Sequence, residues 1–165
     1  MMTTKKRKIT AEELQRQLDA NPEYQKMMKE KEEKMRIFRA ELEKDEEGLV
    51  QEIKTKGIDI DSVWDLVNIN HPFLDNKFIG PYKEVYSILV DHLDKPHHPR
   101  IREGIIRALT EKDARDIAKD KLLDNFYNET DKNLRWVLAN ALTTILTQTE
   151  KKKNPDIELV KKGLV

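Results

Sequence analysis

The chain of 165 residues contains no cysteine. Without thiols it can form no disulfide, no thiolate zinc site and no cysteine nucleophile. Its five glycines leave little material for a phosphate-binding loop, and no nucleophile elbow or paired-carboxylate site is evident. These absences predict a protein that is not an enzyme and that carries neither a metal nor another cofactor.

Long hydrophobic runs are also missing. No apolar segment approaches the roughly 18 residues that a membrane span requires. The basic N-terminal residues are not followed by the apolar segment of a secretory signal. We therefore expect a cytoplasmic protein with no membrane partner.

Neither sign of charge predominates, because 31 Lys and Arg residues balance 31 Asp and Glu residues. A general nucleic-acid binder needs a concentrated cationic face that releases counterions, so this balance argues against nucleic acid as the partner. Charged residues make up 38% of the chain, above the roughly 25% usual for globular proteins. Much of the chain should therefore be solvated helix surface.

The charge and turn patterns divide the chain into three predicted segments. Residues 1–9 contain four consecutive basic residues, which we interpret as a disordered basic tail, with a polyanion-binding signal as the alternative. Residues 10–57 are expected to form a charged helical arm, and residues 58–165 a helical repeat domain. The fold class is all-α.

Helix start and stop signals place two helices in the arm. Thr10 and Glu13 form a capping-box pattern, which predicts a short helix ending near Ala20. Asn21 and the following proline predict a second helix over residues 23–55. Gly57 suits the C-terminal cap of that helix.

The longer arm helix has a heptad pattern that is only half apolar. One stripe is apolar throughout: Met28, Met35, Leu42 and Leu49. The companion stripe mixes apolar and charged residues: Tyr24, Lys31, Phe38, Asp45 and Glu52. A two-stranded coiled coil needs both stripes apolar, so we expect one edge to pack against the repeat domain or a partner. Self-association through residues 22–56 is the alternative.

The repeat domain is expected to begin with short elements. Residues 58–61 suit an extended crossing, and Ser62 suits the cap of a short helix over residues 63–68. Trp64, beside Asp65, is expected to plug the end of the core. An ordered loop over residues 69–82 follows, with four apolar anchors: Phe73, Leu74, Phe78 and Ile79.

The sequence between Lys83 and Leu146 repeats with a period of 33 residues. Examples of the matching pairs are Leu89 with Leu122, Asp91 with Asp124, Arg102 with Arg135, Ile105 with Leu138 and Leu109 with Leu142. Each unit predicts a helix, a turn and a second helix, over residues 82–109 and then 113–148. A last helix over residues 157–164 should cap the stack.

Apolar residues in the second helix of each unit follow the spacing of a buried face. They are Ile101, Ile105, Ala108 and Leu109 in the first unit, and Leu134, Leu138, Ala141, Leu142 and Ile145 in the second. The segment from Ile88 to Leu109, with Pro99-Arg-Ile-Arg opening its second helix, resembles a HEAT repeat, and the second unit is similar. The whole chain also resembles small bacterial HEAT-repeat proteins. The resemblance implies a long N-terminal helical arm followed by a short HEAT-like helical-hairpin stack.

In HEAT-like arrays the second helices form an inner lining that often contacts ligands. The residues of this chain on that face, off the core stripe, form our predicted binding strip: Arg100, Glu103, Arg107, Trp136, Asn140 and Thr144. Trp and Arg are the types most favoured at binding hot spots. The alternative is that Trp136 and Asn140 only pack against the arm or the loop.

Two further groups are interpreted as structural. Arg102 and Arg135 occupy equivalent positions and should tie helices together, with Asp91, Asp94, Asp124 and Asp131 as available partners. His92, His97 and His98 with Asp94 offer metal-ligand chemistry, but their spacing matches no established site. We interpret the histidines as solvated turn residues.

These features predict a non-enzymatic protein-interaction module, an adaptor or scaffold of the HEAT-like class. One alternative is an immunity-type inhibitor of a cognate toxin. Another, implied by the resemblance, is a HEAT-like nucleic-acid-binding or DNA-repair protein with a basic face formed by Arg100, Arg102, Arg107 and Arg135.

Overall fold

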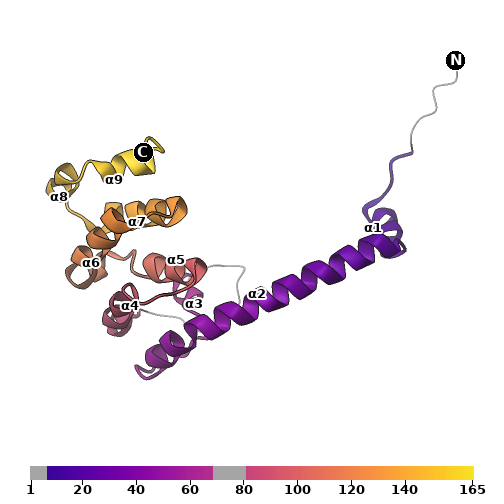
Figure 1. Cartoon of the computed structure of the whole chain (residues 1–165), viewed down its shortest axis with the longest axis horizontal. Helices are drawn as coiled ribbons and strands as arrows, with labels where there is room; N and C mark the ends of the chain where they lie inside the picture. The colour runs from indigo at the N-terminus through magenta and orange to yellow at the C-terminus, as the bar shows by residue number, and fades with distance from the viewer. Residues whose placement is uncertain (1–6, 69–80) are drawn as a thin grey trace, which may run out of the picture. The chain divides into compact units, whose positions relative to one another are not determined.

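A computed structural model describes residues 7–68 and 81–165 (Figure 1). Over these residues the fold is all-α, as predicted, with no strand. The apolar anchors expected in the loop, Phe73, Leu74, Phe78 and Ile79, lie outside the described ranges, as does most of the tail. No helix in the described part of the chain is long and apolar enough to cross a membrane.

The helices follow one another in a simple order. The first three are α1 (Ala11–Asp19), the long α2 (Pro22–Lys54) and the short α3 (Trp64–Val67). They are followed by α4 (Tyr86–His92), α5 (Pro99–Ala108), α6 (Arg115–Asn128), α7 (Lys132–Ile145), α8 (Gln148–Lys153) and α9 (Asp156–Lys161). Short 3-10 turns, Lys83–Val85 and Lys112–Ala114, precede α4 and α6.

The chain divides into two compact units, Met1–Glu41 and Leu42–Val165. In the first unit the predicted capping box is confirmed, because Glu13 N donates to Thr10 Oγ1 at 3.1 Å and Thr10 N donates to the Glu13 carboxylate at 3.2 Å. The Asn21 side chain accepts a hydrogen bond from the backbone N–H of Glu23 at 3.0 Å. Local side-chain chemistry therefore determines where α1 and α2 begin.

The second unit begins at Leu42, which differs from the expected boundary between residues 57 and 58. The C-terminal turns of α2 belong to this unit because Leu49 and Ile53 are fully buried in its core. Gly57 has φ +83°, a left-handed conformation that favours glycine, and it ends the helix as predicted. The apolar heptad stripe therefore has two environments. Leu49 is buried in the core and Leu42 packs against it, whereas Met35 is half exposed.

Two helical hairpins, α4 with α5 and α6 with α7, form the centre of the second unit, as the repeat predicted. Their expected core positions are buried, including Ile101, Ile105, Leu138 and Leu142. Phe126 of α6 is completely buried among them. The two units of the repeat therefore share one continuous hydrophobic core.

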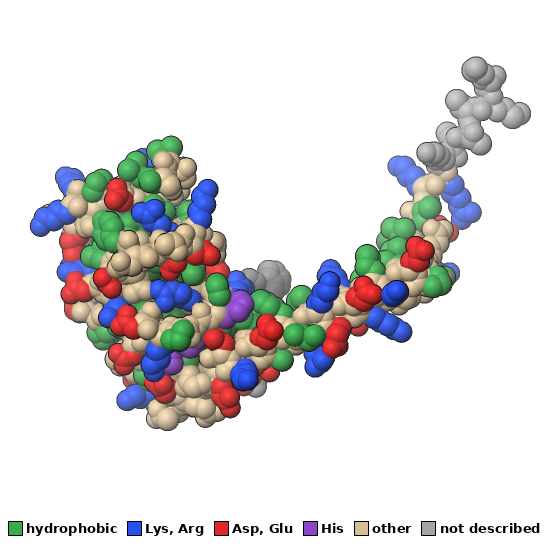
Figure 2. All heavy atoms as spheres, in the orientation of Figure 1, with side chains coloured by type: hydrophobic (Ala, Val, Ile, Leu, Met, Phe, Trp, Pro, Cys, Tyr) green, Lys and Arg blue, Asp and Glu red, His purple; other side chains and the backbone are tan. Residues whose placement is uncertain are grey.

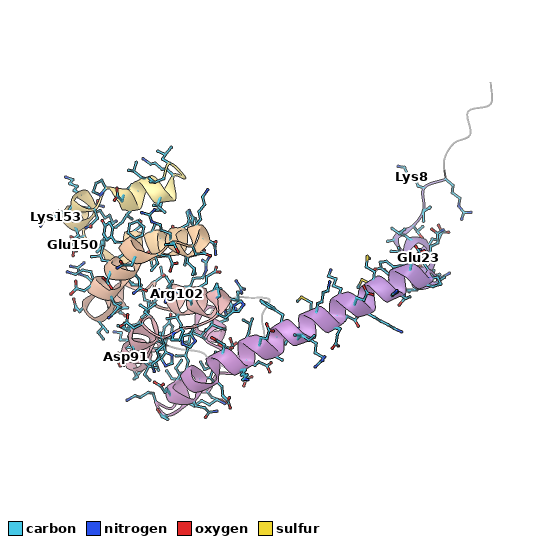
Figure 3. The ribbon with its side chains drawn as sticks, in the orientation of Figure 1. Lys8, Glu23, Asp91, Arg102, Glu150 and Lys153 are labelled. Carbon is cyan, nitrogen blue, oxygen red and sulfur yellow. The ribbon has the colours of Figure 1, made fainter. Side chains whose placement is uncertain are left out.

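The end of the second hairpin differs from the prediction. Instead of reaching residue 148, α7 ends at Ile145, and Thr147 and Glu150 form a second capping box that starts α8. Glu150, labelled in Figure 3, also forms ion pairs with Arg115 at 2.5 Å and Lys119 at 3.0 Å on α6. The Thr-x-x-Glu signal was present in the sequence. The predicted last helix is present as α9 and packs on α7.

Candidate functional site

The predicted binding strip lies on α5 and α7, which pack against each other. Arg100, Glu103 and Arg107 lie three to four positions apart on α5, and Trp136, Asn140 and Thr144 lie four positions apart on α7. These spacings place each set along one helix face. Two contiguous helices of the second unit therefore carry all six predicted residues.

Glu103 is the centre of a charged network in the strip. Its carboxylate accepts a hydrogen bond from Arg107 Nε at 2.9 Å and lies 3.6 Å from Arg100 Nη1. Asn133 Nδ2, on α7, donates to the same carboxylate at 3.5 Å. The Glu103 side chain is only 12% exposed, so these contacts hold it in place. The network connects the α5 residues to α7.

Arg100 is also held by Trp64 of α3. The guanidinium carbon lies 3.8 Å from the centroid of the Trp64 ring, a cation–π contact. Trp64 Nε1 donates to the Arg100 carbonyl oxygen at 3.1 Å. Trp64 packs against the core, as expected for an end plug, and Asp65 accepts hydrogen bonds from Asp61 N and Ser62 N. The short α3 thus supports one end of the strip.

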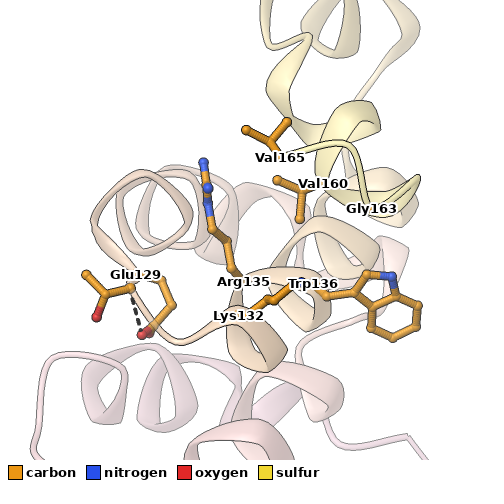
Figure 4. A pocket seen from close by; sticks show the side chains of 8 residues that line it. Glu129, Lys132, Arg135, Trp136, Val160, Gly163 and Val165 are labelled. Atoms are coloured by element: carbon orange, nitrogen blue, oxygen red, sulfur yellow. Dashed lines mark hydrogen bonds between the residues drawn. The ribbon is translucent and has the colours of Figure 1, made fainter.

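Trp136 is 39% exposed and lines a pocket of about 600 Å³ at the start of α7 (Figure 4). The walls come from the turn before α7, from α7 itself and from the C-terminal residues: Glu129, Thr130, Lys132, Arg135, Val160, Gly163 and Val165. In Figure 4 Arg135 and Trp136 leave α7 in different directions, and Val160 and Val165 lie above Trp136 and level with the end of the Arg135 side chain. The pocket therefore combines cationic and apolar walls.

Three other members of the strip line a second, shallower hollow of about 360 Å³. Arg107, Asn140 and Thr144 contribute to it together with Val67, Thr110 and Glu111. Asn140 is half-buried and Thr144 is exposed. The strip therefore borders two pockets, one beside Trp136 and the other beside Asn140, one turn further along α7.

Arg102 ties helices together as predicted, but through different partners (Figure 3). Its Nη1 donates to the Leu93 carbonyl oxygen at 2.7 Å, its Nη2 donates to Asn125 Oδ1, and its Nε donates to the Glu129 carboxylate at 3.3 Å. The expected aspartates have other roles. Asp94 pairs with Lys121 at 2.5 Å, and Asp131 caps α7 by accepting from Leu134 N.

Arg135, the equivalent residue in the second hairpin, makes none of these hydrogen bonds. Its Nε is buried and has no hydrogen-bond partner within the described ranges. The guanidinium carbon lies 5.1 Å from the centroid of the Phe126 ring. The two equivalent arginines therefore differ in their environment.

The interpretation of the histidines as solvated turn residues is wrong for His92 and His97. The His92 side chain is 4% exposed and the His97 side chain 6% exposed. His92 Nδ1 lies 2.8 Å from His97 Nε2, while the outer nitrogens contact Glu52 Oε1 at 3.0 Å and Asp45 Oδ2 at 2.7 Å. The carboxylates come from α2, so the cluster holds its C-terminal turns against α4 and the turn after it.

The surroundings of this cluster shift two pKa values. Burial lowers the pKa of His92, against the opposing effect of its hydrogen bond to Glu52. That hydrogen bond lowers the pKa of the Glu52 carboxyl. His98 Nδ1 instead accepts a hydrogen bond from Arg100 N and caps α5. Among residues 7–68 and 81–165, no group of three or more His, Asp or Glu is arranged to hold a metal ion.

A buried carboxylate on α2 was missed by the sequence analysis. Glu46 is 3% exposed and accepts hydrogen bonds from Val63 N at 3.0 Å and Ser62 Oγ at 3.1 Å. Burial raises the pKa of this carboxyl. The sequence did contain a signal for the two carboxylates that contact the histidines, because Asp45 and Glu52 lie one heptad apart on the mixed stripe. Charged residues on a half-apolar stripe can mark buried polar contacts.

Comparisons with protein-family models, with curated proteins and with solved structures found no match to this chain.

Proposed function

We propose that this chain is a cytoplasmic, non-enzymatic protein-interaction module of the HEAT-like class that binds one protein partner through the binding strip. The observation that carries the proposal is the 39% exposure of Trp136 at the rim of a pocket. A large, rigid aromatic side chain beside a hollow offers much contact area at low conformational entropy cost. Its position on a helix that packs on three others keeps it in place.

The charged residues of the strip favour a role in orientation. Arg107 and Arg100 are both held by Glu103, so little side-chain freedom remains to be lost when a partner binds. Exposed hydrogen-bonding groups around an aromatic anchor form the polar rim of a typical protein interface. The strip thus has an apolar anchor with a pre-arranged polar border.

The same contacts favour a protein partner over nucleic acid. Of the four arginines that a basic face would need, Arg102 is used inside the fold, and Arg100 and Arg107 share the single negative charge of Glu103. Phosphate contacts require cations that are free to replace counterions. An absent or salt-insensitive mobility shift with duplex DNA is the expected result.

A pull-down from native lysate tests the proposal. The double variant Trp136→Ala, Arg107→Ala should lose the partner captured by the wild-type protein, after circular dichroism has shown that both proteins are folded. The matched control is Ile117→Ala, Lys152→Ala, which removes an exposed apolar side chain and an exposed cation from other helices. Retention of the same partner by the strip variant would reject the strip.

Titration of the captured partner then distinguishes an adaptor from an immunity-type inhibitor. Truncation of a hot spot typically costs at least about 2 kcal/mol, so the strip variant should bind the purified partner roughly 30-fold more weakly. An immunity-type inhibitor should bind a single partner with nanomolar or tighter affinity. A broad set of weak partners would support an adaptor instead.

The first unit supports a second candidate, self-association through α2. Met27, Met35 and Ile37 are each about half exposed, and hydrophobic side chains lie at the surface of this unit among charges of both signs (Figure 2). Because Lys31, Glu32 and Arg36 lie beside Met28 and Met35, a second copy would meet complementary charges. A dimer mass in sedimentation velocity, lost in Met28→Glu, Met35→Glu but kept in Lys34→Glu, would support it. A monomer mass at every concentration would reject it.

A further inference from the structure

Arg102 and Arg135 lie 33 positions apart at equivalent places in the two hairpins, but only Arg102 has its hydrogen bonds satisfied. The carboxylate that Arg102 contacts belongs to Glu129, in the turn that follows α6, the first helix of the second hairpin. The same architecture would place a carboxylate near Arg135 only if the chain continued the pattern. Among the described residues Arg135 Nε has no such partner.

The residues in the place of Glu129 cannot supply that carboxylate. The positions 33 and 34 residues beyond Glu129 are Lys162 and Gly163. Lys162 is a cation, and Gly163 has no side chain. Gly163 lines the same pocket as Arg135. A pocket therefore lies beside Arg135, whereas the carboxylate of Glu129 lies beside Arg102.

The Asn125 position is altered in the same way. The residue 33 positions beyond Asn125 is Glu158, which is exposed, and the next is Leu159. The Asn-Pro break between α8 and α9 moves the buried face of α9 to Ile157 and Val160. Neither Glu158 nor Leu159 therefore accepts a hydrogen bond from Arg135 Nε.

We infer that the pocket between α7 and α9 binds a carboxylate side chain of the protein partner, next to an apolar residue that contacts Trp136. This inference rests on the proposed function and identifies the chemistry of the partner at that site. The Arg135 side chain is half-buried with its Nε unpaired, and its guanidinium gains a charge-assisted hydrogen bond when a carboxylate arrives. The partner would take the place that Glu129 has beside Arg102.

The other walls of the pocket fit the same occupant. Lys132 adds a second, exposed cation, and the Glu129 carboxylate is already used by Arg102 and by the backbone N–H groups of Thr130 and Asp131. Val160 and Val165 provide apolar walls. An acidic residue followed by an apolar one therefore matches both the charge and the polarity of the site.

Nuclear magnetic resonance of the full chain tests this occupant directly. The probes are N-acetyl-Glu-Leu-amide, the matched N-acetyl-Gln-Leu-amide and sodium acetate. The glutamate peptide should shift the Nε–H signal of Arg135 and the indole N–H signal of Trp136, at least tenfold more tightly than the glutamine peptide. Equal shifts with both peptides, or an unmoved Arg135 signal, would overturn the inference. Acetate as tight as the peptide would show that the site binds a free carboxylate instead.

A variant that supplies the missing carboxylate provides the second test. Lys162→Glu should pair with Arg135, raise Tm by about 2–4 °C relative to Lys162→Gln, and reduce binding of the glutamate peptide at least tenfold. Unchanged peptide binding in Lys162→Glu would count against the site. If the partner is lost by the Trp136→Ala, Arg107→Ala variant but is retained by Lys162→Glu, the proposed function stands and only the carboxylate site fails.

Discussion

His92 Nδ1 and His97 Nε2 face each other at 2.8 Å in the second unit, with Glu52 and Asp45 at the two ends of the chain of contacts. Each carboxylate contact requires an N–H, and the contact between the rings requires one N–H and one acceptor. Three protons must therefore occupy four ring nitrogens, so the pair carries one positive charge. Burial lowers the pKa of His92 and so opposes a positive charge on that ring.

The stability of the second unit should consequently decrease in acid. With a lowered pKa, His92 takes up a proton more readily in the unfolded chain, so its contribution is present above the ordinary value of 6.5 and is lost as the pH falls below it. The lowered pKa of Glu52 acts in the same direction below 4.5. Lys95, 3.7 Å from Glu52, adds a cation that further opposes a second charge on the rings.

Thermal unfolding at pH 7 and pH 5 measures this effect. In His92→Gln the decrease in Tm between these two values should be smaller than in the wild-type protein, because the titrating ring is gone. The comparison is internal, since Glu46 and the other titrating groups remain in both proteins. An identical pH dependence in the variant would contradict the assignment.

Glu46 should tolerate an amide but not a truncation. Glu46→Gln keeps an acceptor for Val63 N and removes the cost of a buried charge, so at pH 7 the free energy of unfolding should stay within about 0.5 kcal/mol of wild type or rise. Glu46→Ala leaves that N–H without an acceptor and should cost about 1–3 kcal/mol. Urea unfolding at pH 7 compares them. Because burial raises the pKa of Glu46, any advantage of the amide should shrink as the pH falls.

The equivalent arginines should differ in their contribution to stability. Arg102→Ala removes the hydrogen bonds to Leu93, Asn125 and Glu129, all of which leave buried or half-buried acceptors, and should cost about 2–4 kcal/mol. Arg135→Ala removes only a cation–π contact and should cost less than about 1 kcal/mol. Equal losses in urea unfolding would show that Arg135 is also a structural tie.

Two helical glycines should respond oppositely to alanine. A Cβ at Gly104 would lie 2.8 Å from Val63 Cγ1 and 2.9 Å from Trp64 Nε1, so Gly104→Ala should cost about 1–3 kcal/mol. A Cβ at Gly48 meets nothing within 4 Å, so Gly48→Ala should stabilise α2 by about 0.5–1 kcal/mol. Thermal melts of both variants decide the matter; destabilisation by Gly48→Ala would be unexpected.

Local patterns in the sequence determined the all-α class, the starts of α1 and α2 and the two hairpins. Capping by Thr10 and Asn21 acts over three residues, and apolar spacing acts within one helix, so both can be predicted without knowing the rest of the fold. The same periodicity placed Arg107 and Asn140 correctly on packed helices. It could not show that Asn133 of α7 would also contact Glu103.

Only the tertiary structure decided which distant groups meet. Glu52 and His92 are 40 residues apart, and the choice of Glu129 over the nearer aspartates as the partner of Arg102 depends on how the two hairpins pack. The boundary at Leu42 has the same origin, because the residues of one heptad stripe look alike in sequence whether a core covers them or not. Short-range propensity is encoded residue by residue, whereas burial and long-range pairing are properties of the packed whole.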